Sequence, residues 1–258
     1  MNSFKEARME LKQLCRYLDE LLPSQGMNDS CPNGLQVEGK SEVRRIATAV
    51  SASVATIEAA LELESDVLIV HHGLFWQRES PIIQGVKRQK LALLLNNGMS
   101  LFAYHLPLDR HPQLGNNWRA AQEMGWKDLQ PFGYLNGIPI GVKGQFEACT
   151  QEAFKKQLES YYQHSAVEVL GGPQILTTAA LISGGAHYSI MEASQEGVDA
   201  FITGNFDEPT WHQALENKIN FFALGHSATE RVGPRALSEF LARELTISCS
   251  FIDILNPF

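Results

Sequence analysis

The feature that most constrains the fold is a recurring order of short apolar segments and amphipathic ones. In the first half, residues 45–50 (RIATAV) and 66–70 (DVLIV) are apolar without polar alternation, and residues 53–64 between them have helical periodicity. Strands that are buried on both faces have this composition, which is typical of parallel sheets covered by helices. A helix at 86–97 and a strand at 99–104 extend the order, so the sequence predicts an α/β fold.

The second half of the chain repeats this plan. Strands are predicted at 177–185, 198–204 and 219–225, and helices at 189–197 and 208–217. The segment SDVLIVHH can be superposed on VDAFITGN, and NNGMSLFAYHLPLD on ENKINFFALGHSATE with one residue inserted. The identities are few, but they suggest an internal repeat.

We therefore predict two pseudo-repeated α/β halves with mainly parallel sheets, at about residues 1–125 and 126–258. A Gly- and Pro-rich stretch at about 126–173, which contains one clear helix at 151–162, is interpreted as the connection and edge region between the halves. Because ligands of open α/β sheets bind at the carboxyl ends of parallel strands, the site is expected at such ends, between the halves.

A helix precedes this pattern. Ser3 and Glu6 have the spacing of a capping box, and leucines recur at helical spacing from Leu11 to Leu21, before Pro23. The Gly-, Asn- and Pro-rich segment 23–39 that follows predicts an irregular loop.

Composition narrows the class of protein. A chain of 258 residues with 44% hydrophobic and 19% charged residues is globular, and its net charge of −8 disfavours attraction to nucleic-acid phosphates unless a local basic face or bound metal offsets it. The four cysteines have no C-x-x-C spacing, which indicates reduced thiols. Since no apolar leader or membrane-spanning run is visible, a cytoplasmic protein without a membrane partner is expected.

Histidines stand where three of the predicted strands end. His71 and His72 directly follow DVLIV, His105 follows SLFAY, and His226 follows FFALG. One histidine after a strand is more often a satisfied buried residue than a ligand. Two adjacent imidazoles are costly to bury unless each finds a partner, so the whole set favours a ligand role.

Carboxylates accompany two of these histidines at the same spacing. His105 precedes Asp109, and His226 precedes Glu230, with three residues between the imidazole and the carboxylate in each case. Imidazole and carboxylate are the ligands of Zn²⁺, Mn²⁺, Fe²⁺ or Ni²⁺, and a bridging carboxylate holds two ions close together. Glu230, which has the longer side chain, is the better candidate for the bridge. The remaining histidines are interpreted as surface or packing residues: His111, His164, His187 and His212.

Distinctive motifs occur in order from about residue 30 to the end of the chain: PNGLQVEG, VLIVHHGLFW, HLPLDRHPQLGNN, SGG with VDAFITG, and GHSATERVGPRALSEFL with FIDILNP. In these the chain resembles the dinuclear-metal-centre family, whose members are often labelled GTP cyclohydrolase I type 2 homologues, and in particular its short, YbgI-like members. The resemblance implies a hexameric toroid of two-domain α/β subunits, each with two divalent metal ions. The family's ligands fall on His71, His72, Asp109, His226 and Glu230. His105 matches a family histidine beside the metals, which we interpret as a catalytic residue outside the ligand set.

Two positions depart from the family pattern. Asn205 stands where the family usually has an acidic residue, and Ser227 stands where it often has a second histidine. Neither is an inferred ligand, so the metal site is expected to be retained while substrate contacts near Asn205 change. The chain also lacks the large central insertion of longer members.

Residues beside the site suggest substrate contacts. Phe75 and Trp76 follow the His-His pair closely and would stack on a base, although such residues more often pack a lid or a subunit interface. Asn33 and Gly34 either form a pocket rim or belong to a turn that needs a left-handed residue.

The leading functional hypothesis is a metal-dependent hydrolase that acts on a small molecule, either a nucleotide or a cyclic amide. GTP itself is weakly supported because the sequence has no P-loop and no Lys/Arg cluster suited to a triphosphate. The alternative is a non-enzymatic, ring-shaped metal-binding or interaction protein. A ring that encircles DNA is a third hypothesis, for which the net charge of −8 is unfavourable.

Overall fold

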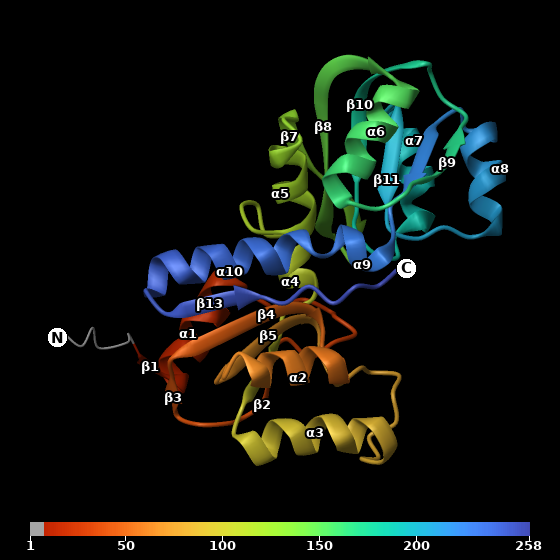
Figure 1. Ribbon diagram of the computed structural model, residues 1–258. Coiled ribbons are helices and arrows are strands. Elements are labelled where there is room, and N and C mark those ends of the chain that lie inside the picture. Colours follow the sequence, from red (N-terminus) through yellow and green to blue (C-terminus); the bar gives the residue numbers. More distant parts are fainter. Residues whose placement is uncertain (1–7) are drawn as a thin grey trace. The chain divides into compact units, whose positions relative to one another are not determined.

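The computed structural model describes residues 8–258, which form two compact units with one large β-sheet each (Figure 1). Unit 1 comprises the described residues up to Leu108 together with Pro234–Ile254. Unit 2 comprises Asp109–Gly233 and Leu255–Phe258. The predicted α/β class is confirmed, since both sheets contain parallel strands connected through helices.

Unit 1 contains a five-stranded sheet with the order β13-β4-β5-β6-β2. Its strands are β2 (Gly34–Val37), β4 (Arg45–Ser51), β5 (Val67–His72), β6 (Ser100–Ala103) and β13 (Ser248–Phe251). The first four strands in this order are parallel, and β2 pairs antiparallel with β6. β6 is buried along its whole length, as expected for a strand covered on both faces. A separate antiparallel pair consists of β1 (Met9–Glu10) and β3 (Glu42–Val43).

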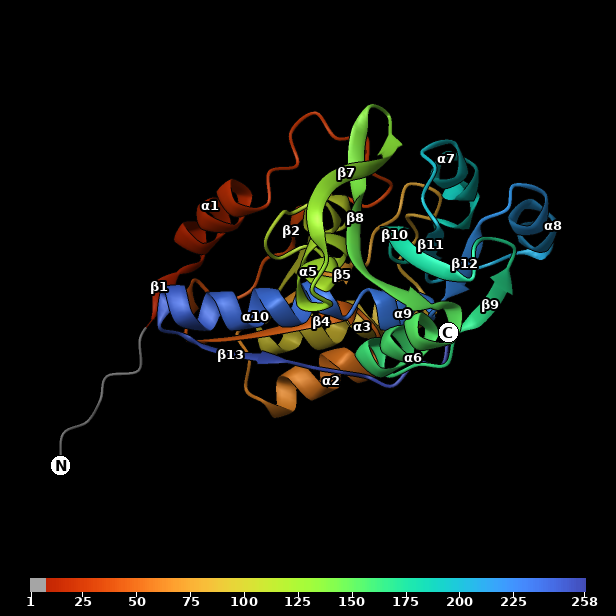
Figure 2. The ribbon, with the colours of Figure 1, turned by 90° about the horizontal axis from the view of Figure 1, so that it is seen from above.

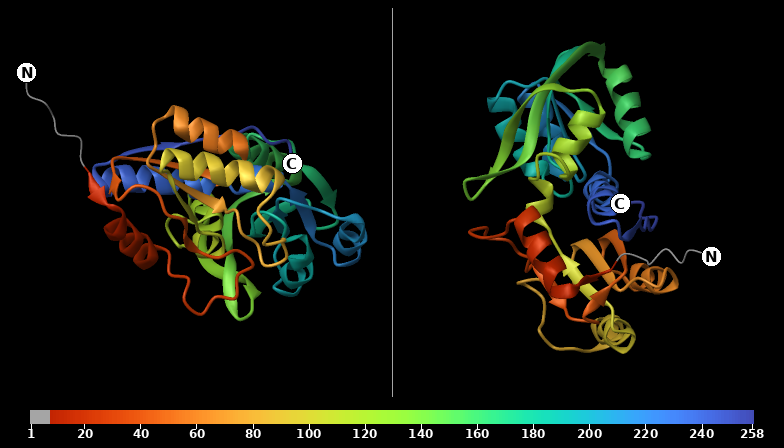
Figure 3. Two further views of the ribbon diagram at one scale, coloured as in Figure 1. Left: turned by 90° about the horizontal axis from the view of Figure 1, so that it is seen from below. Right: turned by 90° about the vertical axis from the view of Figure 1, so that its left-hand side faces the viewer.

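Helices lie on both faces of this sheet. The helices are α1 (Leu11–Leu21), α2 (Val54–Glu62), α3 (Gly85–Asn97), α4 (Leu106–Asp109), which ends in unit 2, and α10 (Val232–Leu245), which begins there. Figure 3 shows α2 and α3 side by side, and Figure 1 shows α10 on the opposite side of the sheet. Ile57 of α2 and Leu94 of α3 are fully buried in one apolar core with the inner residues of β4, β5 and β6. The Ser53 hydroxyl caps the start of α2 by accepting from the Thr56 N–H at 3.0 Å.

The first helix is confirmed over Leu11–Leu21, with Leu11, Leu14 and Leu18 buried. It begins at Leu11 because the two preceding residues form β1, and Glu10 and Gln13 make the capping box. The capping box predicted at Ser3 and Glu6 lies outside the described residues.

Unit 2 contains a six-stranded sheet with the order β7-β8-β10-β11-β12-β9. Its strands are β7 (Lys127–Leu135), β8 (Ile138–Thr150), β9 (Val167–Leu170), β10 (Ile175–Leu181), β11 (Ala200–Thr203) and β12 (Asn220–Ala223). Only β10, β11 and β12 are mutually parallel, so the expectation of a mainly parallel sheet holds for unit 1 but not for unit 2. The Gly- and Pro-rich stretch interpreted as a connection forms the long β7–β8 hairpin at one edge of the sheet, shown in Figure 2, and β9 at the other.

The helices of unit 2 surround a second core. They are α5 (Asn116–Glu123), α6 (Gln151–Tyr162), the 3₁₀ turn η1 (His187–Ser189), α7 (Ile190–Gln195), α8 (Glu208–Glu216) and α9 (His226–Thr229). Phe154 of α6, Ala120 of α5 and Phe222 of β12 are fully buried together in this core. The helix predicted at 151–162 is confirmed, with Thr150 as its cap.

The internal repeat is visible as two triplets of adjacent parallel strands, β4-β5-β6 in unit 1 and β10-β11-β12 in unit 2. The aspartates that precede the two middle strands, β5 and β11, make equivalent hydrogen bonds. The Asp66 carboxylate accepts the N–H groups of Arg44 and Arg45, and the Asp199 carboxylate accepts those of Thr177 and Thr178. The alignment of SDVLIVHH with VDAFITGN superposes these two aspartates.

The division into units differs from the sequence-based boundary at residues 125 and 126. Residues 109–125 belong to unit 2 because Ala120 and Ala121 of α5 pack into its core. Residues 234–254 return to unit 1 because β13 adds to its sheet beside β4. A periodic pattern does not reveal such a return of the chain. Among residues 8–258, no helix is long and apolar enough to cross a membrane.

Candidate metal centre

The end of β5 presents two neighbouring imidazoles in unit 1. The His71 side chain is completely buried, and its Nδ1 donates to the Tyr104 carbonyl oxygen at 3.2 Å. His72 Nδ1 lies 3.0 Å from the Ser51 hydroxyl oxygen. The two rings have centroids 4.6 Å apart. Both side chains are therefore held in place by groups from the flanking strands.

His105 adds a third imidazole to this group. It follows β6, and its ring centroid lies 4.9 Å from that of His71 and 5.6 Å from that of His72. One ring nitrogen from each of the three histidines lies within 4.8 Å of the others. Each Nδ1 has a hydrogen-bond partner, which is how proteins commonly fix a histidine that binds metal through its other nitrogen. The residues present in unit 1 thus fit a divalent metal ion.

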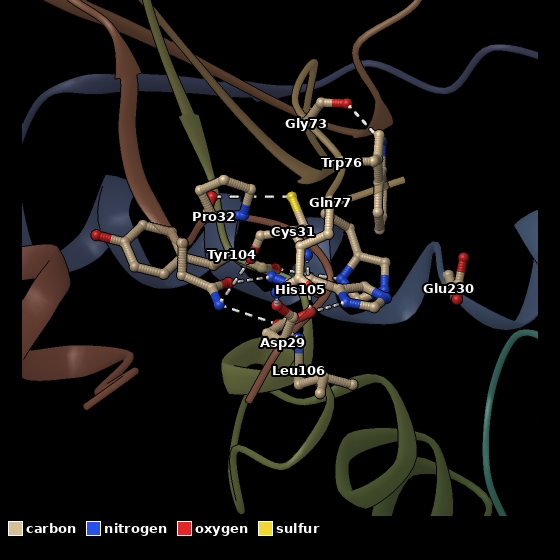
Figure 4. Close-up of polar contacts among 12 residues, drawn as sticks. Asp29, Cys31, Pro32, Gly73, Trp76, Gln77, Tyr104, His105, Leu106 and Glu230 are labelled. Atoms are coloured by element: carbon tan, nitrogen blue, oxygen red, sulfur yellow. Dashed lines mark hydrogen bonds and ion pairs between the residues drawn. The ribbon is translucent and has the colours of Figure 1, made fainter. Parts of the chain in front are cut away.

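Asp29 completes the surroundings of His105 and was not identified from the sequence (Figure 4). Its buried carboxylate accepts four hydrogen bonds: from His105 Nδ1 at 2.7 Å, Asn33 Nδ2 at 2.9 Å, and the backbone N–H groups of Cys31 and Leu106 at 3.1 Å each. Burial alone would raise the pKa of Asp29, but the hydrogen bond and charge of His105 together with the other donors outweigh it and lower the pKa to about 2. An ionised Asp29 accepts the proton of His105 Nδ1, which leaves Nε2 as the unprotonated nitrogen of the neutral ring.

The loop residues proposed from the sequence lie close to this network. Asn33 donates to Asp29, and its side-chain oxygen accepts the His105 N–H at 2.8 Å, so its amide is used within the protein. Gly34 has φ of +98°, the left-handed conformation that the turn hypothesis requires.

The two aromatic residues proposed from the sequence have different surroundings. Trp76 stands edge-on to the His105 ring, with centroids 5.3 Å apart, and donates from Nε1 to the Gly73 carbonyl. Phe75 packs against the apolar core, beneath the ammonium group of Lys87.

Unit 2 carries the second group of candidate ligands. His226 and Glu230 are one helical turn apart at α9, and His226 Nε2 lies 3.2 Å from Glu230 Oε1. The Glu230 and Asp109 side chains are buried. The Asp109 carboxylate accepts from Asn116 Nδ2 at 2.8 Å and from the Ser183 hydroxyl at 3.3 Å. Imidazole with buried carboxylates is again a donor set for divalent metals.

Glycines make room for this second group. A Cβ on Gly184 would lie 2.2 Å from Glu230 Oε1 and 3.2 Å from His226 Nε2. A Cβ on Gly204 would lie 2.6 Å from the His226 Cα. The structure therefore requires glycine at both positions if His226 and Glu230 are to keep their places.

The remaining histidines have other partners. His111 Nδ1 accepts the N–H groups of Gln113 and Leu114 in a turn, and its pKa is lowered by burial and by Arg110. His187 lies 3.4 Å from Asp207, and the exposed His212 lies 3.8 Å from Glu208. His164 packs its ring on Gly225, where an added Cβ would lie 2.9 Å from His164 Nε2. Among the described residues, none of these four belongs to a group with metal-ligand geometry.

The fold and these side chains define a class of protein: a mixed α/β chain with imidazole and carboxylate groups at the ends of parallel strands, able to hold metal ions. Residues 9–257 match the family model described as Duf34/NIF3 (NGG1p interacting factor 3). The chain belongs to this family, which confirms the resemblance found in its motifs.

Curated relatives and solved structures agree over nearly the full length. A protein of Chlamydia pneumoniae named GTP cyclohydrolase 1 type 2 homolog is 48% identical over 97% of this chain and 100% of its own. The protein of that name from Escherichia coli (strain K12) is 42% identical over 96% and 98%. The solved structure of protein ybgI superposes with a TM-score of 0.91 at 40% identity, covering 97% of this chain and 100% of its own. That of TTHA1606 from Thermus thermophilus superposes with a TM-score of 0.90 at 33% identity, with the same coverage.

Proposed function

We propose that this protein is a metal-dependent hydrolase that uses two divalent ions. The observation that carries the proposal is the group of His71, His72 and His105 in unit 1, whose ring nitrogens lie within 4.8 Å of one another. In this group His71 and His72 can serve as ligands with His105 beside them as a base. These imidazoles lie at the carboxyl ends of two adjacent parallel strands. Open α/β sheets bind their ligands at such strand ends.

The ligands proposed for the two ions are His71, His72, Asp109, His226 and Glu230. Glu230 is the proposed bridge because its buried carboxylate has two oxygens to share, with His226 beside it. The donor set suits Zn²⁺, Fe²⁺, Mn²⁺ or Ni²⁺. Bound ions of this kind supply Lewis acidity and lower the pKa of water, which is the chemistry that hydrolysis needs near neutral pH.

His105 is the proposed proton carrier. Because Asp29 holds the proton on Nδ1, the lone pair of His105 lies on Nε2, the nitrogen available to accept a proton from a nucleophile. Asp29 in turn stabilises the imidazolium that forms, and the backbone N–H groups that it accepts keep it in place. Trp76 stands edge-on against the His105 ring and helps to fix its position.

The proposed substrate is a small molecule, either a nucleotide or a cyclic amide. The name of the curated relatives points to the opening of a purine ring, which breaks a C–N bond by hydrolysis. The proposed assembly is a homo-hexameric ring, on the strength of the family resemblance.

The test is a screen of the metal-loaded protein on GTP, phosphodiesters and cyclic amides. We expect an activity that depends on added divalent metal and is lost in Glu230→Ala. The matched control is Glu152→Ala, which removes an exposed carboxylate of unit 2 and should leave the rate unchanged. Equal background rates for fully metallated wild type and Glu230→Ala on every substrate would favour the non-enzymatic metal-binding ring instead.

A further inference from the structure

Unit 2 has two adjoining hollows that form one groove. The inner hollow has a volume of about 330 Å³ and the outer one about 540 Å³. Val167 and Phe206 line both hollows, so the two adjoin at these residues. We call the pair the Phe206 groove.

The inner end of the Phe206 groove lies beside a proposed metal ligand. Gly204, Asn205 and Gly225 line it, and Gly225 immediately precedes His226. Asn205 Nδ2 and His226 Cε1 lie 3.7 and 3.6 Å from the position that a Cβ on Gly185 would take, so both side chains flank the same glycine. Asn205, which lines the inner hollow, therefore has its amide near the His226 ring, while His226 itself does not line the hollow.

The outer end runs between the edge strand β9 and helix α8. Val167 and Glu168 contribute from β9, and Trp211 contributes from α8. The Phe206 and Trp211 rings are each more than half exposed, while Phe221 beneath them is fully buried. Large apolar rings presented in this way suit the face of an aromatic group.

The charge of the groove selects against anions. None of the described residues that line it is a lysine or an arginine. Three carboxylates line it, Glu168, Asp207 and Glu208, together with two histidines, His164 and His212. Glu168 is paired with Lys155 at 2.8 Å. Hydrogen bonds from Thr210 lower the pKa of Asp207 below its ordinary value, and the nearby charge of His187 adds to this effect, so this carboxylate is charged at neutral pH. A phosphate in the outer hollow would meet these charges, whereas a cation would be attracted to them and to the aromatic faces.

We propose that the Phe206 groove binds the non-reacting part of the substrate, and that this part is an uncharged or cationic aromatic group joined to a carbonyl or amide held by Asn205. The proposal rests on the proposed function, because it places the reacting end at His226. It favours a cyclic amide over a nucleoside triphosphate. The amide of Asn205 both donates and accepts, which suits a neutral amide, whereas an acidic residue at this position would only accept when ionised.

Binding to the metal-free full-length protein tests the groove apart from any turnover. The chain has four tryptophans, and labelling with 5-fluorotryptophan gives each a fluorine resonance, with that of Trp211 assigned from Trp211→Phe. The probes are 1-naphthaleneacetamide, 1-naphthylmethylamine and 1-naphthyl phosphate. We expect the first two to shift the Trp211 resonance with saturation and the phosphate to bind about tenfold more weakly or less.

Two variants locate the probe. Phe206→Ser should weaken both favourable probes about tenfold, since it removes one aromatic face. The control Tyr134→Ser alters an equally exposed ring on β7, outside the groove, and should change nothing. Asn205→Asp should weaken the acetamide while strengthening the amine, which a purely structural role of Asn205 would not produce.

The proposal is overturned if the phosphate binds as tightly as the amine, if no probe moves the Trp211 resonance, or if Asn205→Asp leaves the preference between amide and amine unchanged. A Trp211 shift that depends on protein concentration alone would assign the groove to a second copy of the chain and also overturn it. Loss of hydrolysis with retained probe binding would contradict the proposed function but not the groove.

Discussion

The ends of the middle strands in the two units show how one scaffold supports different chemistry. In the superposed repeats, His71 corresponds to Gly204 and His72 to Asn205. At the end of β5 the strand itself supplies two imidazoles. At the end of β11 the equivalent position is a glycine, because a Cβ on Gly204 would lie 2.6 Å from the His226 Cα and 2.7 Å from the Gly184 carbonyl oxygen. The repeat therefore preserves the backbone plan. One copy carries two proposed ligands at this position, and the other makes space for His226, a proposed ligand from the next element.

The largest loss of stability is expected when the glycine at the end of β11 in unit 2 is replaced by a residue with a side chain. Gly204→Val places a branched side chain against backbone atoms that do not yield, and should lower the free energy of unfolding by more than about 3 kcal/mol. The control Gly197→Ala adds a Cβ where nothing lies within 4 Å, at φ of +70°, and should cost only about 1 kcal/mol. Urea unfolding followed by circular dichroism measures both. Equal stability of the two variants would show that Gly204 is not required for space.

The aspartates that precede β5 and β11 allow a second comparison of the two units, since they accept different numbers of hydrogen bonds. Asp199 accepts from the backbone and hydroxyl groups of both Thr177 and Thr178, whereas Asp66 accepts backbone N–H groups of Arg44 and Arg45. We expect Asp199→Ala to cost about 3 kcal/mol of unfolding free energy and Asp66→Ala about half as much. Thermal unfolding of each variant tests this order. If Asp66→Ala is the more damaging of the two, the equivalence of the two aspartates is wrong.

A pH-dependent contribution is expected in unit 1 from Asp29. Its pKa is about 2 in the folded protein against 3.8 ordinarily, so the carboxylate adds stability above about pH 4 and loses it as the pH falls through 2. The difference amounts to about 2 kcal/mol. The stability advantage of wild type over Asp29→Asn, measured by urea unfolding, should therefore shrink between pH 4 and pH 2. An advantage that stays constant over this window would mean that Asp29 is not held ionised by its donors.

The smallest effect concerns the partner of a proposed ligand. The Ser51 hydroxyl lies 3.0 Å from His72 Nδ1, and Ser51→Ala should weaken metal retention about tenfold while leaving the fold intact. Competition with a chelator measures it. Ser194→Ala, which alters a hydroxyl bonded to the Asn217 carbonyl oxygen in unit 2, is the matched control and should have no effect.

The features that could be predicted from the sequence are those that local residue patterns determine. The apolar strands, the helix at 151–162 and the histidines at strand ends are each set by residues close together in the chain, so periodicity and position suffice to find them. Asp29 is different, because its partner His105 is 76 residues away and nothing in the loop reveals that contact. A carboxylate followed at short range by Cys31 and Asn33 donors, in a loop otherwise rich in turn residues, is the one signal that was present.

The hairpin β7–β8 and the return of β13 to unit 1 were not predictable for a similar reason. The hairpin strands contain Pro131, Gly133 and Gly144, residues that usually mark irregular structure, and their register includes a bulge. Gly133 and Gly141 are needed because a Cβ at either position would meet the Ile182 side chain. β13 joins β4 from the far end of the chain, through a pairing that no local pattern encodes.

The central claim is the proposal that His71, His72, Asp109, His226 and Glu230 hold two metal ions, and metal stoichiometry tests it most directly. Protein purified without chelator and reloaded with Mn²⁺, Zn²⁺, Fe²⁺ or Ni²⁺ should approach two ions per chain by elemental analysis and native mass spectrometry. Glu230→Ala should lose both ions together, Asp109→Ala mainly one, and His111→Ala neither. A value that stays near zero after reloading, or a Glu230→Ala variant that keeps both ions, would contradict the account.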